Sequence, residues 1–79
     1  MKLRYKGFEL TAATEQLVET GEWTTRVLIA KHHGKETREK FVFAGNTFKD
    51  KAEAEKHSIE FGREVVDGRY QNATVDDLV

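Results

Sequence analysis

The chain of 79 residues contains no cysteine and no proline. Without cysteine it can form no disulfide, thiolate metal site or cysteine nucleophile. It has a single serine, Ser58, and no apolar segment long enough for a signal peptide or a transmembrane helix. These absences favour a protein of the cytoplasm with no membrane partner. The absence of proline indicates nothing about function.

The composition is that of a soluble folded domain. Apolar residues make up 38% and charged residues 34%, which is too hydrophobic for a disordered chain. The length allows one domain with one core. The net charge of −1 divides into +2 for residues 1–44 and −3 for residues 45–79. This mild asymmetry is typical of a solvated surface and does not by itself indicate a partner.

Period-two alternation predicts strands in the first half of the chain. Residues 2–11 alternate apolar and charged side chains but change parity at Gly7, which predicts one strand interrupted by a β-bulge. Residues 23–31 form the second strand, with the odd-numbered side chains from Trp23 to Ile29 on its apolar face. Residues 12–22 connect the two strands.

A third strand is predicted over residues 38–44, where Phe41 and Phe43 are expected to point into the core. The same alternation places Arg38, Lys40, Val42 and Ala44 on the outer face. The polar segment before it contains Gly34, which supplies the positive φ of a tight turn. The second and third strands are therefore predicted to form an antiparallel hairpin.

A helix over residues 51–67 is the clearest element in the sequence. Asp50 is a suitable N-cap, and Gly68 is a suitable stop signal after the last turn. Small residues four positions apart run along the centre of its apolar arc: Ala54, Ser58 and Gly62. Because a row of small side chains lets a helix approach a sheet closely, we expect this row to face the core.

The predicted fold is therefore α+β. It is a three-stranded antiparallel β-meander with one C-terminal amphipathic α-helix packed on one face (βββα). Residues 1–68 make up the domain. Residues 69–79 form a tail that is either one short helical turn capped by Thr74 or disordered.

No group of residues indicates catalysis, a metal site or a cofactor. His32 and His33 fall at the hairpin tip on opposite faces of an extended strand, so they cannot both ligate one ion without distortion. Ser58 lies on the buried arc of the helix and is a poor nucleophile. No glycine-rich phosphate loop is present. We therefore expect a non-enzymatic protein without catalytic, metal or cofactor-binding residues.

The outer face of the sheet is the candidate binding face, since one helix covers only the other side. Strand alternation predicts that it carries Arg4, Lys6, Arg26, Leu28, Arg38, Lys40 and Val42. This face fits a protein partner, a homodimer or a nucleic-acid backbone, and it also fits an ordinary solvated surface. The acidic balance of the chain and the absence of predicted exposed aromatic residues speak against nucleic acid.

Three features together are similar to those of a set of small proteobacterial proteins without an assigned activity. These features are Tyr5–Phe8, the tryptophan Trp23 that begins the second strand, and the helical stretch from Asp50 to Gly68. The resemblance implies a bacterial cytoplasmic protein. The βββα order also resembles, in topology only, the DNA-binding domains of plant AP2-type factors and of phage-type integrases.

Overall fold

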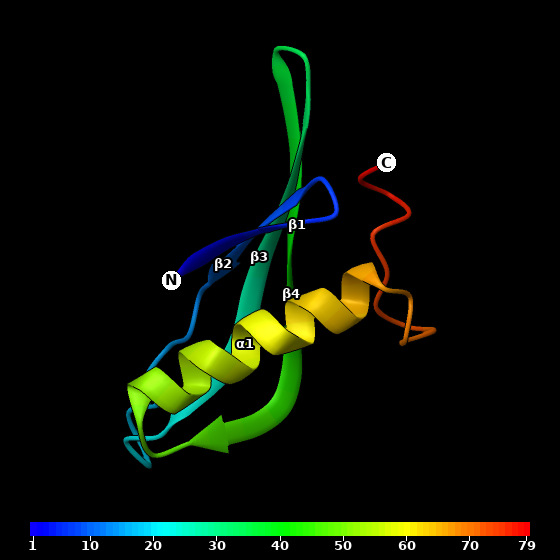
Figure 1. Cartoon of the computed structure of the whole chain (residues 1–79). Helices are drawn as coiled ribbons and strands as arrows, with labels where there is room; N and C mark the ends of the chain where they lie inside the picture. Colours follow the sequence, from blue (N-terminus) through cyan, green and yellow to red (C-terminus); the bar gives the residue numbers. More distant parts are fainter.

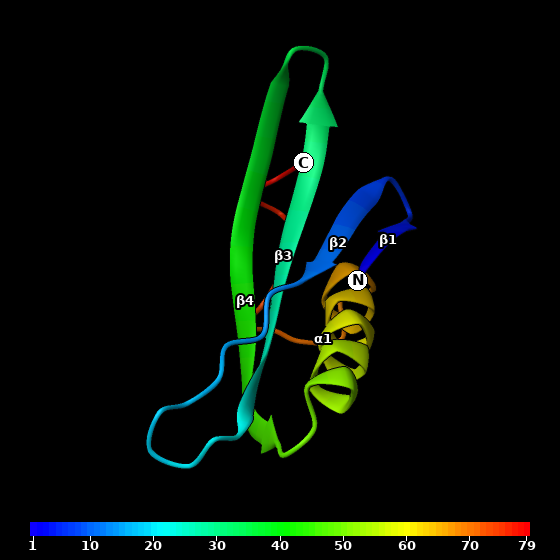
Figure 2. The ribbon, with the colours of Figure 1, turned by 90° about the vertical axis from the view of Figure 1, so that its left-hand side faces the viewer.

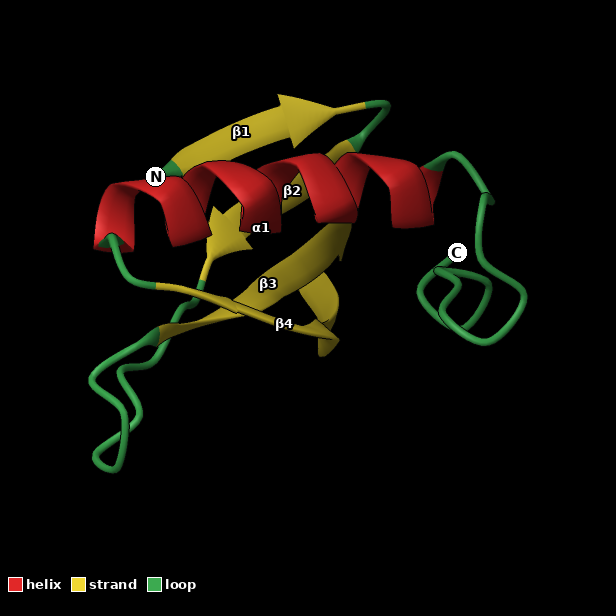
Figure 3. Cartoon of the chain, turned by 90° about the horizontal axis from the view of Figure 1, so that it is seen from below, coloured by secondary structure: helices red, strands yellow, loops and turns green.

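The computed structural model describes residues 1–79 as a four-stranded antiparallel sheet and one helix (Figure 1). The strands lie side by side in chain order: β1 (Lys2–Tyr5), β2 (Phe8–Ala12), β3 (Trp23–His33) and β4 (Glu36–Phe48). The helix α1 (Lys51–Val66) lies across one face of the sheet (Figure 3). The predicted α+β class and antiparallel meander with one C-terminal helix are confirmed, but the sheet has four strands rather than three.

The fourth strand arises at Gly7, where the sequence had predicted a β-bulge within one strand. Lys6 and Gly7 have φ angles of 51° and 85°, and positive φ at both central residues is the signature of a two-residue type I′ hairpin turn. Tyr5 and Phe8 are therefore direct cross-strand partners. The bulge prediction is wrong. Tyr5 and Phe8 share a face, because opposed residues of a hairpin point to the same side.

The predicted hairpin between the second and third strands is confirmed, with longer strands than expected. Gly34 has a φ of 64°, and His33 pairs directly with Glu36 across a two-residue turn. The long hairpin extends well beyond β1 and β2 (Figure 2). At its other end, an irregularity opposite Thr24 and Thr25 bends β4 towards the helix.

The predicted facing of β4 is wrong. The two-residue turn places Val42 opposite Val27, which is fully buried against the helix, so Val42 points inward and is only 8% exposed. Phe41 and Phe43 consequently point to the other side and are 47% and 69% exposed. Side-chain parity reverses with every one-residue change in register, so the length of the turn decides which set is buried.

The helix packs through the row of small residues that the sequence predicted. Ala54, Ser58 and Gly62 are all buried. A Cβ atom at Gly62 would lie 3.1 Å from a methyl carbon of Val27, so any larger residue requires the facing side chains to shift by a few tenths of an ångström. Asp50 caps the first turn by accepting a hydrogen bond from the amide of Ala52 (3.0 Å).

The helix ends at the glycine that was predicted to stop it. Gly68 has a φ of 79°, and its amide donates to the carbonyl of Val65 (3.1 Å). α1 has 16 residues, and no helix of the chain has the length and apolar character needed to cross a membrane.

Residues 69–79 fold back along the β3–β4 hairpin on the side of the helix (Figures 1 and 2). Val75 and Leu78 are buried in the same cluster as the sheet and helix core. A ring nitrogen of His33 lies 2.6 Å from the carbonyl oxygen of Leu78, and Lys40 forms an ion pair with Asp77 (2.8 Å). This segment therefore covers the part of the hairpin that α1 does not reach. The division of the chain at residue 68 stays a prediction.

Candidate interaction face

We use the term open face for the side of the sheet that points away from α1. Cross-strand pairing arranges its side chains in rows, because directly opposed residues share a face. One row runs from Thr11 through Leu28 to Phe41, and the next pairs Arg26 with Phe43. A third row, on the other side of the first, consists of Arg4, Glu9, Ala30 and Glu39.

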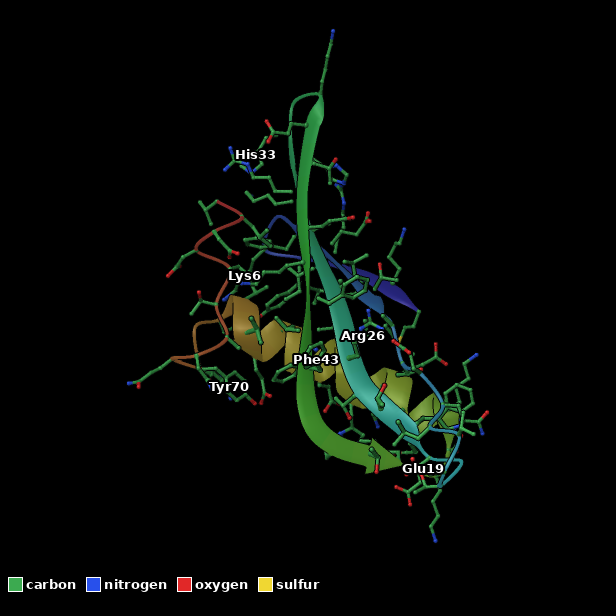
Figure 4. The ribbon with its side chains drawn as sticks, turned by 180° about the vertical axis from the view of Figure 1, so that it is seen from behind. Lys6, Glu19, Arg26, His33, Phe43 and Tyr70 are labelled. Atoms are coloured by element: carbon green, nitrogen blue, oxygen red, sulfur yellow. The ribbon has the colours of Figure 1, made fainter.

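Four neighbouring residues form what we call the aromatic patch: Arg26, Leu28, Phe41 and Phe43. The guanidinium carbon of Arg26 lies 3.9 Å from the centre of the Phe41 ring, a cation–π contact. Arg26 also forms an ion pair with Glu15 of the loop between β2 and β3. Seen from behind the sheet, Arg26 and Phe43 project from β3 and β4 (Figure 4).

One polar atom within the patch is unsatisfied. Arg26 Nε is buried and has no hydrogen-bond partner. Buried N–H groups are normally paired, because an unpaired donor away from water costs about 1–3 kcal/mol.

A groove borders the patch where the β2–β3 loop approaches β4. Its volume is about 420 Å³, and its lining consists of Glu15, Gln16, Leu17, Thr24, Arg26, Phe43 and Ala44. Leu17 is 38% exposed at the rim, so the groove continues the apolar surface of the patch. The patch and groove together form an exposed apolar region with charged groups at one side, an arrangement typical of interaction sites.

The structure brings together three of the seven residues predicted for the binding face. Arg4, Arg26 and Leu28 lie on the open face, in the three adjacent rows described above. Arg38, Lys40 and Val42 have the opposite parity and point to the side of the helix and the tail. Val42 belongs to the hydrophobic core, so its predicted outward orientation is wrong.

Lys6 lies in the β1–β2 turn and not on a sheet face. Its ammonium group donates to Asp67 at the end of the helix (2.6 Å), and Tyr5 also donates to the same carboxylate (2.8 Å). The hydrogen bond to Asp67 raises the pKa of Lys6, and the bonds from Lys6 and Tyr5 lower the pKa of Asp67. Lys6 thus connects the first hairpin to the helix.

Most of the predicted phosphate-binding cations already have a carboxylate within ion-pair distance. The pairs are Lys6 with Asp67, Arg26 with Glu15, Arg38 with Glu36, and Lys40 with Asp77. The hydrogen bond from Lys40 lowers the pKa of Asp77. Arg4 alone among the five has no such partner. Of the five, only Arg4 and Arg26 lie on the open face, and Arg26 is already paired with Glu15, so the open face is a weak electrostatic site for a polyanion.

The residues that sequence reasoning missed are Phe41 and Phe43, because their bulk favoured a core position. The signal that would have found them is the turn. Two residues between His33 and Glu36 fix the pairing of every later residue of β4 with β3. Val27 and Ile29 were already expected in the core, and this pairing places Val42 and Lys40 opposite them. Phe41 and Phe43 have the other parity, so their side chains point to the open face.

No protein-family model, curated protein or solved structure matches the chain. The resemblance drawn from Tyr5–Phe8, Trp23 and the final helix therefore stays a prediction.

Proposed function

We propose that this chain is a non-enzymatic interaction module of the cytoplasm that binds a protein partner through the aromatic patch. The observation that carries the proposal is the exposure of Phe41 and Phe43, at 47% and 69%, on the sheet face opposite the helix and the C-terminal segment. Covering two phenyl rings on binding removes a large apolar area from water, and aromatic residues are enriched in the cores of protein interfaces.

The surroundings of the two rings also suit a protein interface. The ring of Phe41 already shields one side of the Arg26 guanidinium from water. The buried Nε of Arg26 has no hydrogen-bond partner. Arginine and aromatic residues are the usual anchors of such contacts. Arg4, Glu9 and Glu39 supply a mixed-charge border, which favours a partner surface carrying both signs of charge.

The second candidate is a single-stranded nucleic acid. Exposed aromatic residues were expected to be absent, and Phe41 and Phe43 remove that objection because bases can stack on exposed rings. The electrostatic objection remains, since four of the five predicted phosphate-binding cations pair with carboxylates. We therefore rank a protein partner first.

Site-specific photocrosslinking in cells that express the chain tests this proposal. Benzoylphenylalanine replaces Phe43 in one variant and Lys56 in a control, because Lys56 is exposed on α1, which lies on the other side of the sheet. We expect a discrete protein adduct from position 43 and none from position 56. Mass spectrometry of the adduct then identifies the partner.

Other patterns of adducts would contradict the proposal in different ways. Equal adducts from both positions would mean that crosslinking reports chance encounters and not specific binding at the aromatic patch. An adduct from position 43 that disappears on nuclease treatment would replace the protein partner with a nucleic acid. Binding of oligonucleotides that weakens steeply as salt is added would support the same replacement.

A further inference from the structure

The sheet has two edges, and they differ in length and accessibility. β1 forms one edge with four residues, whereas β4 forms the other with thirteen. β4 pairs only with β3, so its outer backbone groups have no strand partner. An unpaired strand edge is a template on which another strand can add.

The outer edge of β4 is open over its most apolar part. A groove of about 320 Å³ runs beside Lys40–Phe43, with Asn72 and Ala73 of the C-terminal segment on its far side. The irregularity opposite Thr24 and Thr25 ends the regular part of β4 near Ala44. The regular stretch available to an added strand is therefore Glu36–Ala44, and Lys40–Ala44 is its most apolar part.

A second copy of the chain can supply that strand in antiparallel pairing about a two-fold axis. Opposed residues must lie on the same face, so the axis has to pass through a residue and not between two residues. Axes at Arg38, Glu39 and Lys40 are unfavourable, because each would place a charge opposite an identical charge.

Four other positions for the axis avoid opposed like charges, and they differ in which side chains they place opposite one another. An axis at Thr37 lies close to the hairpin turn and would pair only polar and charged side chains. An axis at Phe41 would place Phe43 opposite Glu39, and an axis at Phe43 would place Phe41 opposite Gly45. Each of these leaves at least one exposed phenyl ring without an aromatic partner.

The axis at Val42 pairs every exposed ring of β4. Phe41 of each copy then lies opposite Phe43 of the other, Val42 lies opposite itself, and Lys40 lies opposite Ala44. Aromatic cross-strand pairs are among the more stabilising contacts in a sheet, and no like charges are opposed in this register. Self-complementarity of this kind is what a symmetric dimer requires.

We propose that a second copy of this chain adds to the outer edge of β4 in antiparallel register over Lys40–Ala44, with the two-fold axis at Val42. The result is a continuous eight-stranded sheet whose open face carries four phenylalanine rings in one cluster. This inference rests on the free edge of β4, and it does not require the aromatic patch to bind any other protein. A five-residue overlap is short, so the dissociation constant is expected at roughly 0.1–1 mM.

Charge exchange at the two phenylalanine positions tests the register. In F41K/F43E the proposed pairing opposes a lysine with a glutamate twice, and in F41E/F43E it opposes two glutamates twice. Both variants lose the rings and share the same acidic substitution of Phe43 beside Arg26, so they differ only in the sign of the side chain that replaces Phe41. Circular dichroism verifies that both fold before sedimentation equilibrium measures their association.

We expect the unaltered chain to dimerise, and F41K/F43E to dimerise about tenfold more tightly than F41E/F43E at low salt. High salt should reduce that difference. An unaltered chain that stays monomeric at millimolar concentration overturns the proposal. Equal association of the two variants also overturns it, because the proposed register places residue 41 of one copy directly opposite residue 43 of the other.

A second measurement needs no substitution. Isotope-filtered NMR on a mixture of labelled and unlabelled chain detects contacts between copies alone. The proposed register predicts contacts between the ring protons of Phe41 and Phe43 of different copies. Contacts that join Phe43 only to Phe43, or that involve no residue of β4, would exclude it. A dimer with these contacts and no other protein captured at position 43 would separate this inference from the proposed function.

Discussion

Val42 and Phe43 are neighbours on β4, yet Val42 is 8% exposed and Phe43 is 69% exposed. The difference reflects the two faces of the sheet. The inner face is covered by α1 along a row of small residues and by Val75 and Leu78 of the C-terminal segment. The open face has only the β2–β3 loop at one end. In this chain, apolar character alone does not decide which side of a strand is buried.

The inner face also uses polar groups in a way that the open face does not. The hydroxyl of Ser58 accepts a hydrogen bond from the backbone amide of Arg26 (3.0 Å) and donates to the carbonyl of Ala54 (2.7 Å). β2 ends at Ala12, so the amide of Arg26 lacks the strand partner that its carbonyl finds in Ala13. Ser58 therefore connects helix and sheet at the point where strand pairing stops.

The largest expected effect on the free energy of unfolding comes from a buried residue of the inner face, and we compare it with an exposed residue of the open face. Leu10 is fully buried between sheet and helix, so Leu10→Ala should lower the free energy of unfolding by about 2–5 kcal/mol through lost burial and a residual cavity. Phe43→Thr, on the exposed side, should change it by no more than about 0.5 kcal/mol. Urea unfolding of both variants measures the contrast. Similar losses would mean that the open face is covered in solution.

A smaller effect on stability is expected from the hydroxyl of Ser58, which connects the helix to the sheet. Ser58→Ala leaves the amide of Arg26 buried and unpaired, which should cost about 1–3 kcal/mol of unfolding free energy. Hydrogen exchange of the Arg26 amide should accelerate in the same variant. Glu60→Ala, on the exposed side of the same helix, serves as the control. An unchanged exchange rate at Arg26 would show that another acceptor takes the place of Ser58.

The smallest effect concerns the ion pair between the first hairpin and the end of the helix. Because the pKa of Asp67 is lowered in the folded chain, its contribution is present above the ordinary carboxyl pKa and is lost as pH falls through the folded value. The raised pKa of Lys6 means that its own contribution is lost only when pH rises through that raised value. The pair therefore stabilises the fold between these limits.

Asp67→Asn should remove part of the decrease in stability as pH falls below about 5, because the titrating carboxylate is gone. Chemical unfolding at several pH values measures it, with Asp76→Asn in the exposed part of the tail as the control. An Asp67→Asn profile as steep as that of the unaltered chain would show that other carboxylates account for the acid dependence.

The sequence by itself determined the elements whose signals are local. Asp50 and Gly68 bound the helix, the small residues between them form its contact with the sheet, and Gly34 marks the hairpin turn. These predictions succeeded because capping, positive φ and helical periodicity each depend on a few neighbouring residues. The helix was therefore predictable almost to its ends, and the β3–β4 hairpin was predicted at its turn, although its strands are longer than expected.

Only the tertiary structure decided which face each residue of β4 occupies. Residues 41–44 are apolar at every position, so period-two alternation assigns no inside or outside. The choice came from the two-residue turn at Gly34–Lys35, and from contact with a helix far along the chain. Strand register is a relation between segments, and a shift of one residue would exchange Val42 for Phe43 in the core and remove the aromatic patch.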